Sequence, residues 1–259
     1  MSEEVFQWPE DRDPAPEIRD LTEDGSLTGG LLVRVIRRTG EDRAGEALLL
    51  KEQALRIVLD GKRMTRLVCT GADLPALAAG WLLTSGFISR ASDLASLKIT
   101  GAGQEFLAEA ERRTKTAQRT MAPVCARKIR REWLFHLADT FRVEQPLYLA
   151  THSIHSCILS RSGKVLYLCE DIGRHNALDK AAGYAILHGI PPAECEVYLS
   201  GRLPVDMVEK ALRAGFPVLA GKALPTAEAV EFASAFGLLL AGRAGAESFE
   251  VFCGEKKLI

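Results

Sequence analysis

From Leu147 to the C-terminus, short apolar runs typical of strands alternate with patterns typical of helices. The strand-like runs are LYLA (147–150), SCILS (156–160), VLYLC (165–169), CEVYLS (195–200), FPVLA (216–220), LLLAG (238–242) and FEVFC (249–253). The helix-like segments are 175–189, 205–215 and 226–237. Such alternation predicts an α/β layered domain in which crossover helices connect a mostly parallel central sheet.

Upstream of this domain the sequence predicts three further parts. Residues 1–28 are predicted to form a polar, mobile N-terminus and 29–110 a smaller β-rich α+β unit. Residues 111–126 are predicted to form a mobile basic loop, and the α/β domain spans 127–259. In the second part, Asp60 and Gly61 predict a hairpin turn, and Asp73 is expected to cap a helix from Pro75 to Thr84. EFLAEAERR, which starts at Glu105, is interpreted as helical, and so is the segment 127–141.

Composition excludes several classes of protein. The 33 Lys and Arg residues against 34 Asp and Glu leave a net charge of −1, which provides no electrostatic footprint for nucleic acid or an anionic membrane. The acidic N-terminus has no basic or apolar signal region, so a cytoplasmic location is expected. The apolar stretch Leu74–Ile88 is about 15 residues, too short to span a bilayer. Six cysteines without a C-x-x-C pair predict neither a disulfide framework nor a zinc site.

Three predicted strand-to-helix turns each place a glycine beside a cation. The pairs are Gly173 with Arg174, Gly201 with Arg202, and Gly221 with Lys222. Glycine allows close backbone approach, and a helix N-terminus with a neighbouring cation binds phosphate well. Because the carboxyl ends of parallel strands lie along one edge of a sheet, these turns can converge on one ligand. Glycines and cations are also common in such loops, and only their threefold recurrence favours a dinucleotide-like ligand.

Three other segments carry possible chemistry. EDIGRHNALDK (170–180) crowds acids, Arg174, His175 and Asn176 behind an apolar strand, which fits a binding site and a paired helix start equally well. THSIHSC (151–157) suggests a metal, but the zinc deaminase signature is absent. Cys125, beside Arg127 and Lys128 at a predicted helix start, is either a reactive thiolate or a buried thiol.

On the segments EDIGRHNALDK and LSGRLPVDMVEKALRAGFPVLAGKALPT, the chain resembles the formate dehydrogenase accessory sulfurtransferase family (FdhD). The resemblance runs from about Ala54 to Phe252 and includes LVCTGADLPALAAGWLLTSGFI. It implies a cytidine-deaminase-like α/β domain without zinc and a homodimer in the cytoplasm. It also implies a protein that takes persulfide sulfur from a cysteine desulfurase. That sulfur is passed to Mo-bis(molybdopterin guanine dinucleotide) before the cofactor enters the formate dehydrogenase apoprotein.

The resemblance also assigns candidate residues. The guanine nucleotide part of the pterin cofactor is expected at the three turns and at a C-terminal loop whose small residues let backbone N–H groups approach phosphates. These candidates are Arg174, His175, Asn176, Ser200, Gly201, Arg202, Lys222, Arg243, Ala244, Gly245, Ala246, Glu247 and Ser248.

This sequence departs from the family pattern at the expected sulfur carrier. Where the family has C-G-x-C-G, this chain has Ala122 and Pro123 in the first two positions and Cys125 in the fourth. Two hypotheses follow. Cys125 alone is the catalytic persulfide carrier, or the chain is a divergent relative that binds and delivers the cofactor without transferring sulfur. Cys157, which the family pattern lacks, is a further thiol whose contribution the sequence leaves open.

Overall fold

The computed structural model describes residues 14–22, 25–114, 121–124 and 127–259. Within these ranges the strands form three sheets, and no helix is long and apolar enough to cross a membrane. The helices are α1 (Leu74–Thr84), α2 (Arg131–Val143), α3 (Pro146–Thr151), α4 (Arg174–Leu187), α5 (Val205–Ala214) and α6 (Ala227–Ala235). Short 3-10 turns cover Ala91–Asp93, Pro192–Glu194 and Glu255–Lys257.

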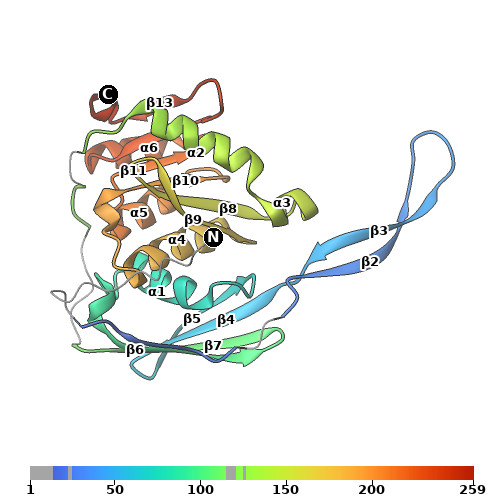
Figure 1. Cartoon of the computed structure of the whole chain (residues 1–259), viewed down its shortest axis with the longest axis horizontal. Helices are drawn as coiled ribbons and strands as arrows, with labels where there is room; N and C mark the ends of the chain where they lie inside the picture. The colour runs from blue at the N-terminus through green and yellow to red at the C-terminus, as the bar shows by residue number, and fades with distance from the viewer. Residues whose placement is uncertain (1–13, 23–24, 115–120, 125–126) are drawn as a thin grey trace.

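The first sheet belongs to the N-terminal unit and has the strand order β1-β6-β7-β4-β5. Its strands are β1 (Glu17–Asp20), β4 (Gln53–Leu59), β5 (Lys62–Cys69), β6 (Leu94–Ala102) and β7 (Glu105–Arg112). The predicted turn between β4 and β5 is confirmed, since Asp60 and Gly61 both have positive φ. A separate two-stranded ribbon, β2 (Thr28–Val35) and β3 (Arg43–Leu50), projects from the body (Figure 1).

The six-stranded sheet belongs to the α/β domain and has the order β13-β12-β11-β10-β8-β9. Its strands are β8 (His155–Arg161), β9 (Lys164–Asp171), β10 (Cys195–Leu199), β11 (Val218–Gly221), β12 (Leu239–Gly242) and β13 (Glu250–Cys253). Alternate residues of these strands pack on opposite faces. Ile158, Tyr198 and Ala220 pack on the α2 side, whereas Leu159, Val197 and Leu219 pack on the side of α4 and α5.

The prediction of a mostly parallel central sheet is wrong. Only β10-β11 and β11-β12 pair in parallel, and the other three pairings are antiparallel. The cause lies in a turn between β8 and β9, where Ser162 and Gly163 both have positive φ and close a tight hairpin. A hairpin reverses the chain, so β8 and β9 cannot be joined as a crossover unit.

Two local predictions were also wrong, and a third is confirmed only in part. Residues 147–150 belong to helix α3, which starts at Pro146. The segment after Gln104 is strand β7, whose alternate residues Phe106, Ala108 and Ala110 are buried in the period of two that a strand requires. The helix after Asp73 is present, but Asp73 has positive φ and makes no side-chain cap bond. Its carboxylate instead accepts a hydrogen bond from the Tyr167 hydroxyl at 2.7 Å.

Helices α1 and α4 lie between the two large sheets and pack together unusually closely (Figure 1). A Cβ atom added at Gly80 would lie 1.7 Å from the Asp179 carbonyl oxygen, and one added at Gly183 would lie 1.8 Å from the Ala76 carbonyl oxygen. Glycine at both positions therefore lets the two backbones touch, and one hydrophobic core continues from the N-terminal unit into the α/β domain.

A Gly80→Ala variant is expected to lose about 1–3 kcal/mol of unfolding free energy, measured by urea denaturation. The added methyl group would force two backbones apart, and this outweighs the gain of up to about 1 kcal/mol in helix propensity. The matched control is Gly25→Ala, where an added Cβ would meet only the Gln53 Nε2 atom at 3.9 Å. If Gly80→Ala matched the wild type, the close packing of α1 and α4 would not be stabilising.

Candidate functional site

The predicted turns meet at one edge of the six-stranded sheet. Strands β9, β10, β11 and β12 all run in the same direction, because β9 and β10 are each antiparallel to β8 and β10 is parallel to β11. Arg174, Ser200, Lys222 and Arg243 all lie within three residues of the end of one of these strands. His155 begins β8 at the same edge, where it pairs with Asp171.

Three of these edge residues, together with Gly201, lie close to one another. We call His155, Arg174, Ser200 and Gly201 the sheet-edge cluster. The Ser200 hydroxyl lies 3.1 Å from His155 Nδ1 and accepts a hydrogen bond from the Ser156 N–H at 3.0 Å. A Cβ atom at Gly201 would lie 3.2 Å from Arg174 Cδ and 3.4 Å from His155 Nδ1. The glycine therefore makes room for both side chains at the strand end.

The cluster has an unused hydrogen-bond donor. Arg174 Nε is buried and has no partner among the described residues, a costly state unless a ligand completes it. Burial lowers the pKa of His155, and the nearby Arg174 and His175 lower it further. Since the imidazole is then neutral at neutral pH, the guanidinium is the cluster's positive charge.

Two other predicted ligand contacts are engaged with the protein. His175 Nε2 lies 2.7 Å from Asp206 Oδ2. Burial alone would raise the pKa of Asp206, but its hydrogen bond and electrostatic interaction with His175 outweigh burial and lower this pKa. Asn176 is buried, and its amide group donates to the Val68 carbonyl at 2.7 Å and to Asp171 at 2.8 Å. Both side chains thus fix α4 rather than offer free groups.

Two acids of EDIGRHNALDK form ion pairs, one of them fully buried and the other partly exposed. Lys180 Nζ lies 2.7 Å from Asp171 Oδ2, and neither side chain is exposed. Thr70 of the N-terminal unit donates to the same carboxylate and accepts from Lys180. Asp179, the residue before Lys180, pairs with Lys210 at 2.6 Å. The segment 170–180 therefore links the N-terminal unit to the strand end and helix start that carry the cluster.

A cavity of about 350 Å³ opens beside the cluster; we call it the His155 cavity. Its lining includes His155, Ser200 and the exposed Lys222. Gln145 and Tyr148, which sequence reasoning missed, also line it, as does His152, which was considered only within the metal hypothesis for 151–157. They come from α3 and the residues on either side of it, and α3 contains the segment 147–150 that was predicted as a strand. The sequence signal for this helix was Pro146, since proline favours the first position of a helix. In the structure, the N–H groups of Leu147 and Tyr148 at the helix start donate to the Glu170 carboxylate at 3.0 and 2.8 Å.

The C-terminal loop, residues 243–248, agrees only in part with the predicted phosphate-binding loop. Its Ala244 N–H donates to the Gly221 carbonyl at 3.0 Å and its Gly245 N–H to the Ser248 carbonyl at 2.9 Å, so these groups are not free for phosphate. Arg243 pairs with Glu250 at 3.0 Å. Ala246, Glu247 and Ser248 are exposed, and so is Arg202 at the neighbouring turn.

Cys125 lies outside the described residues, but its neighbours are placed at the opposite edge of the sheet. Val124 N–H donates to the Phe236 carbonyl at 3.0 Å, before the start of β12. Arg127 pairs at 3.0 Å with the buried Glu196, near the start of β10. Cys157 is buried in the core of β8, and burial raises its pKa, so it is not an accessible thiol.

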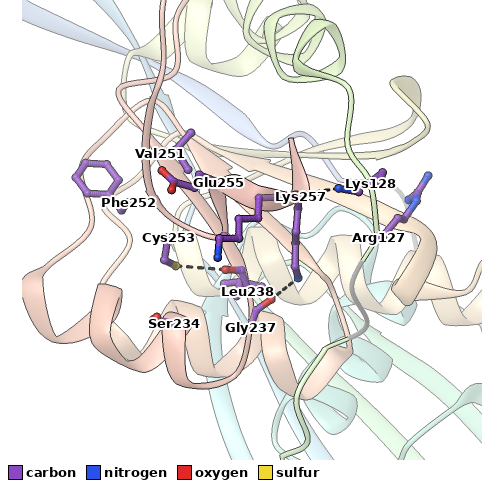
Figure 2. A pocket seen from close by; sticks show the side chains of 12 residues that line it. Arg127, Lys128, Ser234, Gly237, Leu238, Val251, Phe252, Cys253, Glu255 and Lys257 are labelled. Carbon is purple, nitrogen blue, oxygen red and sulfur yellow. Dashed lines mark hydrogen bonds between the residues drawn. The ribbon is translucent and has the colours of Figure 1, made fainter. Parts of the chain in front are cut away.

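A cavity of about 630 Å³ occupies this opposite edge (Figure 2). Its lining includes three cations, Arg127, Lys128 and Lys257, together with the half-buried Cys253. The Cys253 thiol donates to the Leu238 carbonyl at 3.2 Å, and burial raises its pKa. Across the described ranges, no group of three or more His, Cys, Asp or Glu residues could hold a metal ion.

Fold and site together define a layered α/β protein whose six-stranded sheet carries arginine and lysine residues at the carboxyl ends of four strands. The model of the FdhD/NarQ family matches residues 50–129 and 100–259, and the chain belongs to this family.

Individual relatives agree. A sulfur carrier protein FdhD from Streptomyces avermitilis is 30% identical over 87% of this chain and 94% of its own length. The FdhD protein of Sulfurisphaera tokodaii is 34% identical over 52% of this chain and 54% of its own. A crystal structure of a putative formate dehydrogenase accessory protein from Desulfotalea psychrophila superposes with a TM-score of 0.78 at 25% identity. That match covers 90% of this chain and 100% of the other.

Proposed function

We propose that this protein transfers sulfur to Mo-bis(molybdopterin guanine dinucleotide) for use in formate dehydrogenase, with Cys125 as the catalytic residue. In the first step the Cys125 thiolate attacks the terminal sulfur of a cysteine desulfurase persulfide. A new S–S bond forms at Cys125, and the desulfurase thiolate leaves as its own S–S bond breaks. In the second step the S–S bond at Cys125 breaks, Cys125 leaves as a thiolate, and its terminal sulfur bonds to the molybdenum of the cofactor. The cofactor is the substrate, and its metal supplies the two electrons that bring this sulfur to the sulfide level.

The observation that carries the cofactor site is the buried, unpartnered Arg174 Nε in the sheet-edge cluster. A phosphate oxygen is a strong acceptor for a guanidinium donor, and Ser200, the Gly201 backbone, Arg202 and Lys222 lie at the same edge. We assign the guanine nucleotide end of the cofactor to this edge and to the exposed part of the 243–248 loop.

The placement of Val124 and Arg127 constrains the route of the sulfur. They lie at the start of the parallel strands, and the cluster lies at their ends. Five-residue β10 spans roughly 15 Å between the two edges. The proposal therefore separates the sulfur carrier from the guanine nucleotide end of the cofactor by about the length of one strand, and the molybdenum end of the same molecule has to span that distance.

A second function follows from the departure at Ala122, where the family has the first cysteine of its loop pattern. In this alternative the protein binds and delivers the cofactor without transferring sulfur. The sheet-edge site would be used in the same way, so only the fate of sulfur on Cys125 distinguishes the two functions.

An Arg174→Ala variant is expected to bind guanosine diphosphate about 10- to 100-fold more weakly, because it loses a charge-assisted hydrogen bond worth about 1.5–3 kcal/mol. Isothermal titration calorimetry measures the change. The control is Arg66→Ala, an exposed arginine that pairs with Glu105 on the N-terminal sheet. Equal affinities of the Arg174→Ala variant and the wild type would remove Arg174 from the nucleotide site.

A further inference from the structure

The cavity of about 630 Å³ beside Arg127, which we call the opposite-edge cavity, is not used by the cofactor site at the other end of the sheet. Its volume lies within the range of about 300–1,000 Å³ that small-molecule sites have. A water molecule takes up only about 30 Å³ in the liquid, so the cavity has room for more than a single inorganic ion. Val251 and Phe252 give it a partly apolar wall.

The lining of the opposite-edge cavity carries more positive than negative charge. Its charged residues are Arg127, Lys128, Glu255, Lys256 and Lys257. Arg127 pairs with the buried Glu196 at 3.0 Å, which leaves three lysines and one carboxylate. This surplus of positive charge favours an anionic ligand.

Two of the lysines are available to such a ligand. Lys128 and Lys256 are exposed, and neither forms an ion pair within the described part of the chain. Lys128 Nζ donates to the Lys256 carbonyl at 3.0 Å, one of the three hydrogen bonds that an ammonium group can donate. Lys257 instead donates to the Gly237 carbonyl (Figure 2). A carboxylate would be a strong acceptor for the remaining donors.

The chain on both sides of Cys125 lies at this cavity. Val124 N–H donates to the Phe236 carbonyl at 3.0 Å, and the next residue, Gly237, lines the cavity, as does Arg127. Cys125 itself lies outside the described residues, but it is bonded to Val124, and consecutive Cα atoms are only about 3.8 Å apart. The sulfur acceptor of the proposed function is therefore attached to the chain beside the opposite-edge cavity.

We propose that the opposite-edge cavity binds a small organic persulfide that bears carboxylate groups, and that this molecule donates sulfur to Cys125 without a desulfurase. The inference rests on the proposed function, in which Cys125 is the sulfur acceptor. The carboxylates would contact Lys128 and Lys256, and the carbon chain would lie against the apolar wall. Glutathione persulfide, a tripeptide derivative with two carboxylates, has this chemistry.

The transfer is a thiol exchange that balances without a further reactant. The Cys125 thiolate attacks the outer sulfur of the bound persulfide, and a new S–S bond forms at Cys125. The S–S bond of the donor breaks, and glutathione leaves as a thiolate while the terminal sulfur keeps its proton. The lysines of the cavity favour the anionic donor and the thiolate that leaves.

Binding of reduced glutathione, measured by isothermal titration calorimetry, tests the cavity without any sulfur transfer. The Lys128→Glu/Lys256→Glu variant is expected to bind about 10-fold more weakly or worse, because two charged donors become acceptors. The control is Lys98→Glu, at an exposed lysine on β6 of the N-terminal sheet. Circular dichroism checks that each variant is folded. No binding by the wild type, or equal affinity in the double variant, would overturn the proposal.

Mass spectrometry with glutathione persulfide as the only sulfur donor tests the transfer. The wild type is expected to gain about +32 Da on Cys125, at an initial rate that saturates with donor concentration. The double variant is expected to need a donor concentration about 10-fold higher or more for half-saturation. Rates that rise linearly and equally in both proteins would overturn the proposal, because any exposed thiol would react in that way.

Two further donors separate this inference from the proposed function. Half-saturation at a lower concentration of thiosulfate than of glutathione persulfide would overturn the assignment to an organic donor. Modification of Cys125 by a cysteine desulfurase but not by glutathione persulfide would overturn this inference and leave the proposed function standing. An unmodified Cys125 with every donor would contradict both transfer steps, and glutathione affinity would still decide whether the cavity binds this class of ligand.

Discussion

Replacement of Cys125 by serine is expected to abolish the activation of formate dehydrogenase in cells that lack their own FdhD. Under the sulfur-transfer proposal, Cys125 is the thiol that accepts sulfur from the desulfurase. A serine hydroxyl is nearly the same size but forms no persulfide, so loss of activity would report the chemistry of the residue. Formate oxidation in cell extracts measures the effect.

Mass spectrometry separates sulfur transfer from cofactor delivery without sulfur. After incubation with a cysteine desulfurase and cysteine, the wild type is expected to carry about +32 Da on Cys125. Cys253→Ser is the matched control, since Cys253 is the half-buried thiol of the neighbouring cavity. Full activity of Cys125→Ser would contradict the sulfur-transfer proposal. An unmodified Cys125 together with retained cofactor binding would favour delivery alone.

Lys180→Ala is expected to lower the free energy of unfolding by about 3–5 kcal/mol, because it leaves the Asp171 carboxylate buried without its counter-ion. Both side chains of this pair are fully buried, and Asp171 also holds Thr70, Gly173 and Asn176. Urea unfolding followed by circular dichroism measures the loss.

The matched control removes an ion pair at the surface. Arg243 and Glu250 are 3.0 Å apart, with side chains 62% and 47% exposed, so Arg243→Ala is expected to change stability by no more than about 1 kcal/mol. A similar small change in Lys180→Ala would mean that water or a shifted side chain replaces the lost lysine. The buried pair would then not be a major source of stability.

Sequence reasoning predicted most of the elements after His155, because both faces of that sheet are covered and its strands are continuous apolar runs. It was wrong for 147–150, where Pro146 starts a helix too short to show a helical period. It was also wrong for β7, whose alanines and glutamates favour helix while its partners β4 and β6 impose a strand. Strand direction was unpredictable without recognising the Ser162–Gly163 turn.

For the candidate site, the glycine and cation pattern correctly placed the turns at one sheet edge. The individual roles were less predictable, because a pattern of residue types does not show which groups are already paired. His175 and Asn176 look as available as Arg174 in the sequence, yet Asp206, Val68 and Asp171 engage them in the structure. The residues from α3 that line the His155 cavity required the tertiary fold.

The ion pairs of Lys180 and Lys210 have a consequence for how the molecule unfolds. Lys180 and Asp171 contact Thr70, and Lys210 and Asp179 contact Thr84, so side chains of the C-terminal half find their polar partners in the N-terminal half. Separating the halves would expose these charges and the shared apolar core in a single event. Heat or denaturant should therefore melt both in one cooperative transition, and a fragment starting at Arg127 should not be stable by itself.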